Sequence, residues 1–171
     1  MTATNTAVCL VLVVSFVQLA QCTRSDALAT EAEKHLGSRQ WSYFSIRKTG
    51  RPGRKCNIFV AEMIQDAGGV VPLHRSETWS PICAAEWSNP NSRSLLESGC
   101  WKHVTSPRRG DVAGFGGHVG IVTGPRSSIG ASSVIADAVV ISDWGFRPGH
   151  NPVYWRYTCP WNPITTSDTS G

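Results

Sequence analysis

The sequence predicts an α+β domain in which N-terminal helices pack on a small antiparallel β-sheet. Two observations lead to this fold class. Apolar residues recur at helical spacing only in the first 70 residues of the chain. After residue 100 the pattern changes to short β segments separated by turns, in the order of a meander. A hydrophobic fraction of 41% over 171 residues is enough for one core, and therefore for one domain.

The N-terminal residues are typical of a secretory signal peptide. Residues 7–20 are almost wholly apolar, and they are too few and too close to the N-terminus to span a membrane comfortably. Ala20 and Cys22 put small residues at the two positions that a signal peptidase inspects, so we expect a signal peptide over residues 1–22. No Lys or Arg precedes the apolar run, which is atypical, and an uncleaved anchor is the alternative. Secretion implies an oxidising compartment.

The expected mature chain has one domain over residues 23–164 and a flexible tail over residues 165–171, which are small and polar. Its net charge stays at +4, because the first 22 residues hold no charged side chain. This modest basic excess favours an anionic partner such as a bacterial cell wall, and it is too weak to indicate nucleic acid. We expect a monomer without stable membrane association, since no long apolar run remains after the signal peptide.

Two helices are expected before the sheet. The first covers Ser25–Leu36, where Gly37 ends it, and the second begins near Cys56 and ends at the glycines of residues 68–69. Each has an apolar stripe at helical spacing: Leu28, Ala29, Ala32 and Leu36 in the first, and Phe59, Val60, Met63, Ile64 and Ala67 in the second.

An irregular stretch, residues 70–100, separates the helices from the sheet and is rich in Pro, Ser, Asn and Trp. Pro107 and Gly110 mark a turn after the first β segment, and we interpret Asp111 as a structural residue that holds this turn. The expected β segments are residues 101–105, 111–115, 118–122, 127–132, 138–144 and 154–158.

Four cysteines remain after the signal peptide, at positions 56, 83, 100 and 159. They can form two disulfides, or one disulfide beside a nucleophilic thiol and a remaining cysteine. Cys83 and Cys100 lie at the two ends of the irregular stretch and would link them, so we favour this pair. Cys159 is the remaining cysteine in this scheme, or it pairs with either of the two instead.

Cys56 has the position of a nucleophile. A helix N-terminus presents unpaired N–H groups and the positive end of the helix dipole, and both favour a thiolate. Arg54 and Lys55 add positive charge beside it. A structural cysteine would lie mid-helix on the apolar face, whereas Cys56 precedes that face. The backbone N–H of Cys56 would also be available to an oxyanion.

His118 is the candidate base. It begins a predicted strand, which would hold the imidazole rigidly against a helix N-terminus, and Gly117 before it leaves room for a ligand backbone. The four other histidines lie on the first helix, in loops beside prolines or in a short strand: His35, His74, His103 and His150. No spacing typical of a zinc site occurs, so we expect no metal and no other cofactor.

The segments KCNIFVAEMIQDAG and PRRGDVAGFGGHVGIVTG together resemble the papain-like cell-wall amidases of the NlpC and CHAP groups. In that clan a cysteine opens a helix, and a Pro-x-x-Gly-Asp turn leads to a strand that begins with the histidine. The details KCN-x-FV and SDWGFR are most similar to type VI secretion amidase effectors and to the secreted relatives that ticks and mites acquired from bacteria. The resemblance covers roughly residues 41–157.

The resemblance implies a papain-like fold and the hydrolysis of amide bonds in the stems or cross-links of bacterial peptidoglycan, with an antibacterial role. It implies Cys56 as the nucleophile and His118 as the general base of an acyl-enzyme mechanism. Trp41 and Tyr43 would line the substrate groove, as upstream aromatic residues do in relatives, and Trp144 lies close to the site in sequence. The bond that is cut stays open, with a preference for the cross-link.

The residue that orients the imidazole departs from the pattern of the clan. Relatives often carry a polar residue on the strand after the histidine strand, where this chain has Gly130 and Ala131. Asp143 is our first candidate, because a carboxylate holds an imidazolium well. Ser132 and Asp137 are the alternatives.

Two other functions belong to the same fold. One is a secreted protein that binds peptidoglycan without cutting it, and the loss of the Cys–His pair would indicate it. The other is a thiol acyltransferase acting on lipids, which would need an apolar tunnel or a membrane helix.

Overall fold

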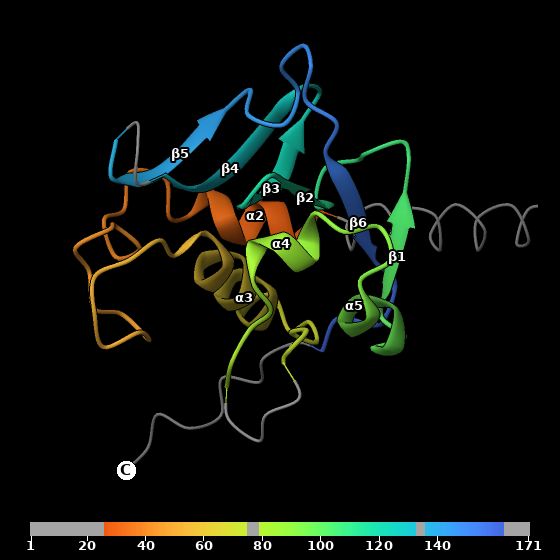
Figure 1. The fold of residues 1–171 in the computed structure, drawn as a ribbon, viewed down its shortest axis with the longest axis horizontal. Helices are drawn as coiled ribbons and strands as arrows, with labels where there is room; N and C mark the ends of the chain where they lie inside the picture. The colour runs from red at the N-terminus through yellow and green to blue at the C-terminus, as the bar shows by residue number, and fades with distance from the viewer. Residues whose placement is uncertain (1–25, 75–78, 133–135, 163–171) are drawn as a thin grey trace, which may run out of the picture.

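The computed structural model describes residues 26–74, 79–132 and 136–162 (Figure 1). The signal peptide predicted over residues 1–22 and the tail predicted over residues 165–171 lie outside the described residues. None of the described helices is both long and apolar enough to cross a membrane.

A six-stranded antiparallel sheet forms the centre of the fold, in the order β1-β6-β2-β3-β4-β5. The predicted meander is confirmed for β2 to β5, whereas the last strand, β6, lies between β1 and β2 (Figure 1). The strands are β1 Trp101–Val104, β2 Val112–Phe115, β3 His118–Gly124, β4 Ser127–Ser132, β5 Ala138–Ser142 and β6 Val153–Tyr157.

The described helices are α2 Ala27–Glu33, α3 Cys56–Asp66, α4 Ala84–Trp87 and α5 Arg93–Glu97. The two predicted helices are confirmed as α2 and α3, with α2 ending at Glu33 rather than Leu36. The short helices α4 and α5 lie in the stretch predicted to be irregular, since four or five residues are too few to show a helical period.

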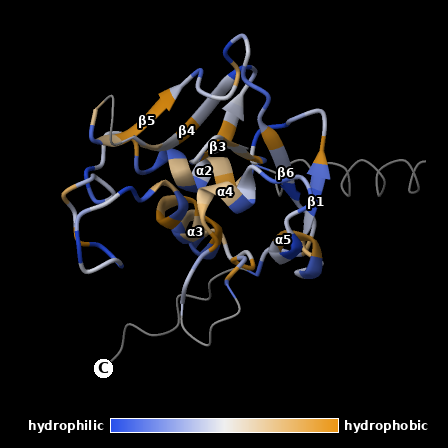
Figure 2. Cartoon of the chain, viewed as in Figure 1, coloured by the Kyte–Doolittle hydropathy of each residue, from blue (hydrophilic) through white to orange (hydrophobic). Residues whose placement is uncertain are grey.

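The core lies between the helices and one face of the sheet. Side chains of α3 are buried along almost its whole length, and α3 packs on β3 and β4, while α2 covers the same two strands. Figure 2 shows the hydrophobic residues gathered in α3 and in the strands around it. Trp155 on β6 is fully buried and donates from Nε1 to the carbonyl oxygen of Trp87, which ties β6 to α4.

A glycine allows α4 to approach the sheet closely. A Cβ at Gly114 on β2 would lie 2.4 Å from the carbonyl oxygen of Trp87. This close approach holds α4 beside the turn that leads to His118, so the position of α4 depends on the absence of a side chain at Gly114.

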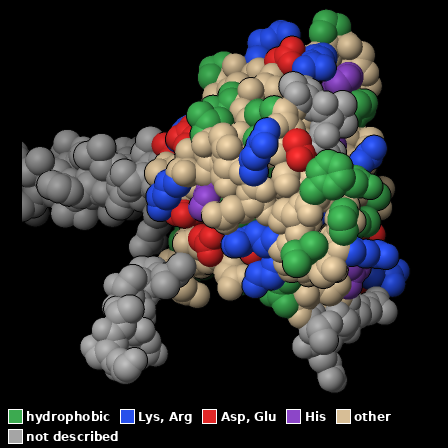
Figure 3. All heavy atoms as spheres, turned by 90° about the vertical axis from the view of Figure 1, so that its left-hand side faces the viewer, with side chains coloured by type: hydrophobic (Ala, Val, Ile, Leu, Met, Phe, Trp, Pro, Cys, Tyr) green, Lys and Arg blue, Asp and Glu red, His purple; other side chains and the backbone are tan. Residues whose placement is uncertain are grey.

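The loop between α2 and α3 follows the edge of β5. Gly37 donates to the carbonyl oxygen of Val139, and Val139 donates to that of Ser38. Further along, Phe44 and Ile46 are exposed. Figure 3 shows this side of the molecule, where hydrophobic, basic and acidic side chains are interspersed.

The disulfide is Cys100–Cys159, and the preferred pair Cys83–Cys100 was wrong. The ladder of β1 and β6 pairs Trp101 with Tyr157, which brings the residues just outside both strands together. The two Cα atoms are 4.9 Å apart. Cys83 is an exposed free cysteine at the start of α4.

We expect Cys159→Ser to lower the free energy of unfolding by about 2–4 kcal/mol, because the disulfide restricts an unfolded chain over a sequence separation of 59 residues. Urea denaturation of the oxidised protein measures this loss. Cys83→Ser is the matched control and should stay within about 0.5 kcal/mol of the wild type. An equal loss in both variants would contradict the assigned pairing.

Candidate active site

A cleft of about 330 Å³ lies over the face of the sheet that points away from the helices. Alternate residues of a strand point to opposite faces of the sheet, and one set of residues in β4 and β5 forms the floor of the cleft. Ser128 is paired with Ser142 in this set, and Gly130 with Val140. The residues between them, such as Ile129 and Val139, belong to the core. Further residues that line the cleft are Arg54, Cys56, Gly117, His118, Ala131, Ser132, Trp144 and Arg147.

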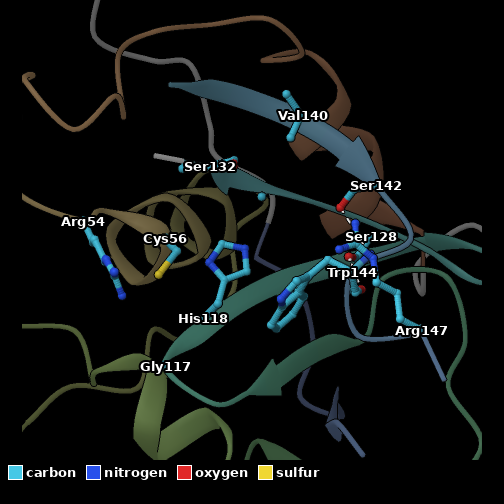
Figure 4. A pocket seen from close by; sticks show the side chains of 12 residues that line it. Arg54, Cys56, Gly117, His118, Ser128, Ser132, Val140, Ser142, Trp144 and Arg147 are labelled. Carbon is cyan, nitrogen blue, oxygen red and sulfur yellow. Dashed lines mark hydrogen bonds between the residues drawn. The ribbon is translucent and has the colours of Figure 1, made fainter. Parts of the chain in front are cut away.

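Cys56 and His118 face each other in this cleft (Figure 4). Cys56 is the first residue of α3, and His118 is the first residue of β3. Because α3 packs directly on β3, the two elements bring together residues that are 62 positions apart in sequence. The predicted nucleophile and the predicted base therefore share one site.

Burial controls the charge of both groups. It raises the pKa of the Cys56 thiol, although the backbone N–H groups of Val119, Asn57 and Cys56 and the charge of Arg54 act in the opposite direction. Burial, and secondly Arg54, lowers the pKa of His118 to about 4. We expected the helix N-terminus to lower the thiol pKa, but its effect is smaller than the cost of desolvation. At neutral pH the site therefore holds a neutral thiol beside a neutral imidazole.

The three candidates for orienting His118 lie in different places. Asp143 is exposed, and its carboxylate accepts from Arg147 Nε at 2.7 Å, which lowers the pKa of Asp143. The Oδ1 atom of Asp137 accepts from the backbone N–H of Tyr43, in the loop before α3. Ser132 is the one of the three that lines the cleft.

Gly130 and Ala131, which we expected near the place of the orienting residue, offer no polar side chain to His118. A Cβ at Gly130 would lie 3.4 Å from His118 Nε2, so this nitrogen faces the backbone of β4. The ring is instead packed by Trp144, with centroids 4.4 Å apart and planes at 89°. The backbone of Trp144 is held by two hydrogen bonds, because its carbonyl oxygen accepts from Ser128 Oγ and its backbone N–H donates to Ser142 Oγ. We therefore expect Trp144 to position the imidazole.

Two of the predicted substrate residues line the cleft. Gly117 has φ +114°, a backbone conformation that residues other than glycine rarely adopt, and Trp144 lies beside His118. Trp41 is instead buried in the core, where its indole N–H donates to Glu62, so its position gives it no contact with the cleft. Tyr43 is exposed and is not among the described residues that line the cleft.

Asp111 has the predicted structural role. Its Oδ2 accepts from the backbone N–H of Arg108 at 2.7 Å, which holds the turn before β2, and from Arg156 Nη2 on β6 at the same distance. The ion pair with Arg156 also helps to keep β6 beside β2.

Four residues that line the cleft were not predicted from the sequence: Ser128, Val140, Ser142 and Arg147. Small and polar residues alternate with Ile129 in β4 (SSIGAS), and this alternation predicts one polar face. Away from the cleft, Glu31, His35 and Asp66 offer three ligand atoms within 4.8 Å of one another, but the Glu31 carboxylate is already paired with Lys34.

Comparison with known proteins gives matches only among solved structures, since no family model and no curated protein matches the chain. The peptidoglycan hydrolase RipB from Mycobacterium tuberculosis superposes with a TM-score of 0.51 at 18% identity, over 78% of this chain and 64% of that one. The P60 domain of an antigen from M. avium subspecies paratuberculosis gives 0.50 at 17% identity, over 78% and 94%. The chain has the papain-like α+β fold of NlpC/P60 domains. It spans about two thirds of the RipB structure.

We expect kcat/KM to fall on the acid side through a pKa near 4 rather than near the ordinary 6.5, because His118 must be neutral to accept the thiol proton. The charge of Arg54 lowers the pKa of His118, so Arg54→Gln should raise this pKa. The fall of kcat/KM on the acid side should then occur at higher pH. Arg51→Gln removes an exposed charge that does not line the cleft, and it is the control. A wild-type limb near 6.5, with native circular dichroism throughout, would contradict this assignment.

We expect Trp144→Ala to lower kcat by about 10- to 100-fold, because the imidazole loses the ring that fixes its orientation. Trp144→Phe keeps an aromatic ring at this position and should recover most of the rate. Steady-state kinetics with a soluble peptide stem separates kcat from KM. Similar losses in both variants, or a change in KM alone, would rule out the positioning role.

Proposed function

We propose that this protein hydrolyses an amide bond in the peptide part of bacterial peptidoglycan, with Cys56 as the nucleophile and His118 as the general base. The observation that carries the proposal is the thiol at the start of α3 facing the imidazole at the start of β3 within a cleft. The fold adds support, since RipB, which has the same fold, is a peptidoglycan hydrolase.

The neutral state of both groups suggests the order of events. The Cys56 thiol transfers its proton to His118 as sulfur attacks the amide carbonyl carbon, so no stable thiolate precedes the substrate. The oxyanion forms near the N-terminus of α3, where the backbone N–H of Cys56 and the helix dipole favour negative charge. His118 then gives its proton to the leaving amine, and a water molecule, deprotonated by His118, hydrolyses the thioester.

The same proposal includes an extracellular, antibacterial role for a monomer. It is supported by the apolar N-terminal segment and by the Cys100–Cys159 disulfide, which is typical of proteins in oxidising compartments. The resemblance of KCN-x-FV and SDWGFR to amidase effectors and their secreted tick and mite relatives remains a prediction that favours bacterial targets.

A second candidate function is peptidoglycan binding without cleavage. Two points favour it: the resemblance puts an orienting polar residue near Gly130 and Ala131, which have no polar side chain, and burial raises the pKa of the Cys56 thiol. The facing Cys56 and His118 side chains favour the hydrolase, because a binding protein has no need of this pair.

Digestion of purified peptidoglycan sacculi, read by mass spectrometry of the released muropeptides, tests the hydrolase. The wild type should release new fragments whose masses identify the bond, and Cys56→Ala should lower the rate by at least about 10³-fold. Cys83→Ser removes the other free thiol and should keep full activity. Sedimentation of an inactive wild type with sacculi would instead support the binding protein.

A further inference from the structure

The cleft has ionised side chains of one sign only. Its lining includes two arginines, and no Asp or Glu is among the described residues that line it. A site of this kind attracts anionic substrates and repels cationic ones. The peptide stems of peptidoglycan carry carboxylates, so the charge of the cleft bears on which stems it accepts.

The two arginines differ in what they contact. Arg147 is paired with the Asp143 carboxylate at 2.7 Å, so its charge is largely compensated within the protein. Arg54 is exposed, and within the described part of the chain its guanidinium has neither an ion pair nor a hydrogen bond. Its five N–H donors are therefore available to a ligand.

Arg54 and its neighbour Lys55 have separate roles. The Lys55 side chain is buried, and its Nζ donates to the backbone carbonyls of Ser42, Tyr43 and Gly53. The side chains of these two consecutive residues therefore lie in different surroundings. Lys55 holds the loop from inside, whereas Arg54 lines the cleft.

Arg54 lies on the opposite side of Cys56 from His118 (Figure 4). Since His118 protonates the leaving amine, the amine side of the scissile bond lies toward His118. The acyl side then extends toward Arg54. The charge of Arg54 acts on both Cys56 and His118, which is consistent with a guanidinium close to the reacting groups.

We propose that Arg54 binds a carboxylate on the acyl side of the scissile amide, so that the enzyme prefers stems with a free carboxylate to stems in which this group is amidated. The inference rests on the proposed function and adds the substrate class. A guanidinium pairs with a carboxylate through two parallel hydrogen bonds, whereas a carboxamide offers one acceptor oxygen and no charge. Binding of the carboxylate also offsets the charge that lowers the pKa of His118, which makes His118 a stronger base.

Matched peptide stems that carry either a carboxylate or a carboxamide at this position test the proposal. At pH 7 the wild type should show a kcat/KM about tenfold higher for the carboxylate stem. Arg54→Gln should make kcat/KM equal for the two stems, because the carboxylate loses its partner, and Arg54→Lys should keep part of the preference. Arg51→Gln should keep the full preference, because Arg51 is exposed outside the cleft.

Calorimetry of the same two stems with Cys56→Ala gives a readout that needs no turnover. The carboxylate stem should bind about tenfold more tightly, and adding Arg54→Gln should make the two affinities equal. Equal binding or equal rates for both stems would overturn the role of Arg54 while leaving the hydrolase in place. A preference in binding without any cleavage by the wild type would instead keep the carboxylate site and refute the hydrolase.

Discussion

The buried ammonium group of Lys55 fixes the loop that leads to Cys56 and the candidate site. A positive charge removed from water must be compensated by hydrogen bonds, and Nζ donates to three backbone carbonyls within residues 42–53. These carbonyls come from two separate parts of the loop before α3, Ser42–Tyr43 and Gly53, so one side chain ties these parts together beside the N-terminus of the helix. Cys56 then enters the buried side of the cleft, and Arg54, one residue before Lys55, lines its open side.

Burial gives the site both its rigidity and its charge state. The packing of α3 on β3 places Cys56 beside His118, and the same packing raises the pKa of the thiol and lowers that of the imidazole. A thiolate–imidazolium pair is therefore disfavoured in the free protein. We propose that a carboxylate of the substrate binds Arg54. Its negative charge would then reduce the repulsion between the Arg54 guanidinium and a protonated His118. Selection of the substrate and activation of the base would then be one electrostatic effect.

The imidazole of His118 lies between the backbone of β4 and the ring of Trp144. A Cβ at Gly130 would lie 3.4 Å from Nε2, and the ring of Trp144 packs edge-on against the imidazole. Trp144 is fixed by the hydroxyls of Ser128 and Ser142, which belong to two neighbouring strands. An aromatic contact of this kind holds the ring in place without adding a charge, in a cleft where the ionised side chains are arginines.

The sequence by itself determined the helices α2 and α3, all six strands, and the pairing of Cys56 with His118, because each of these depends on local periodicity or on the first residue of an element. The tertiary structure decided what depends on distant partners. Pairing of β6 with β1 selects Cys100–Cys159, and the nearby guanidinium of Arg147 binds the carboxylate of Asp143. Strand order, and the partner that each cysteine or charged side chain finds, depend on contacts between residues far apart in the sequence. The local pattern of residue types does not show which of several partners lies closest.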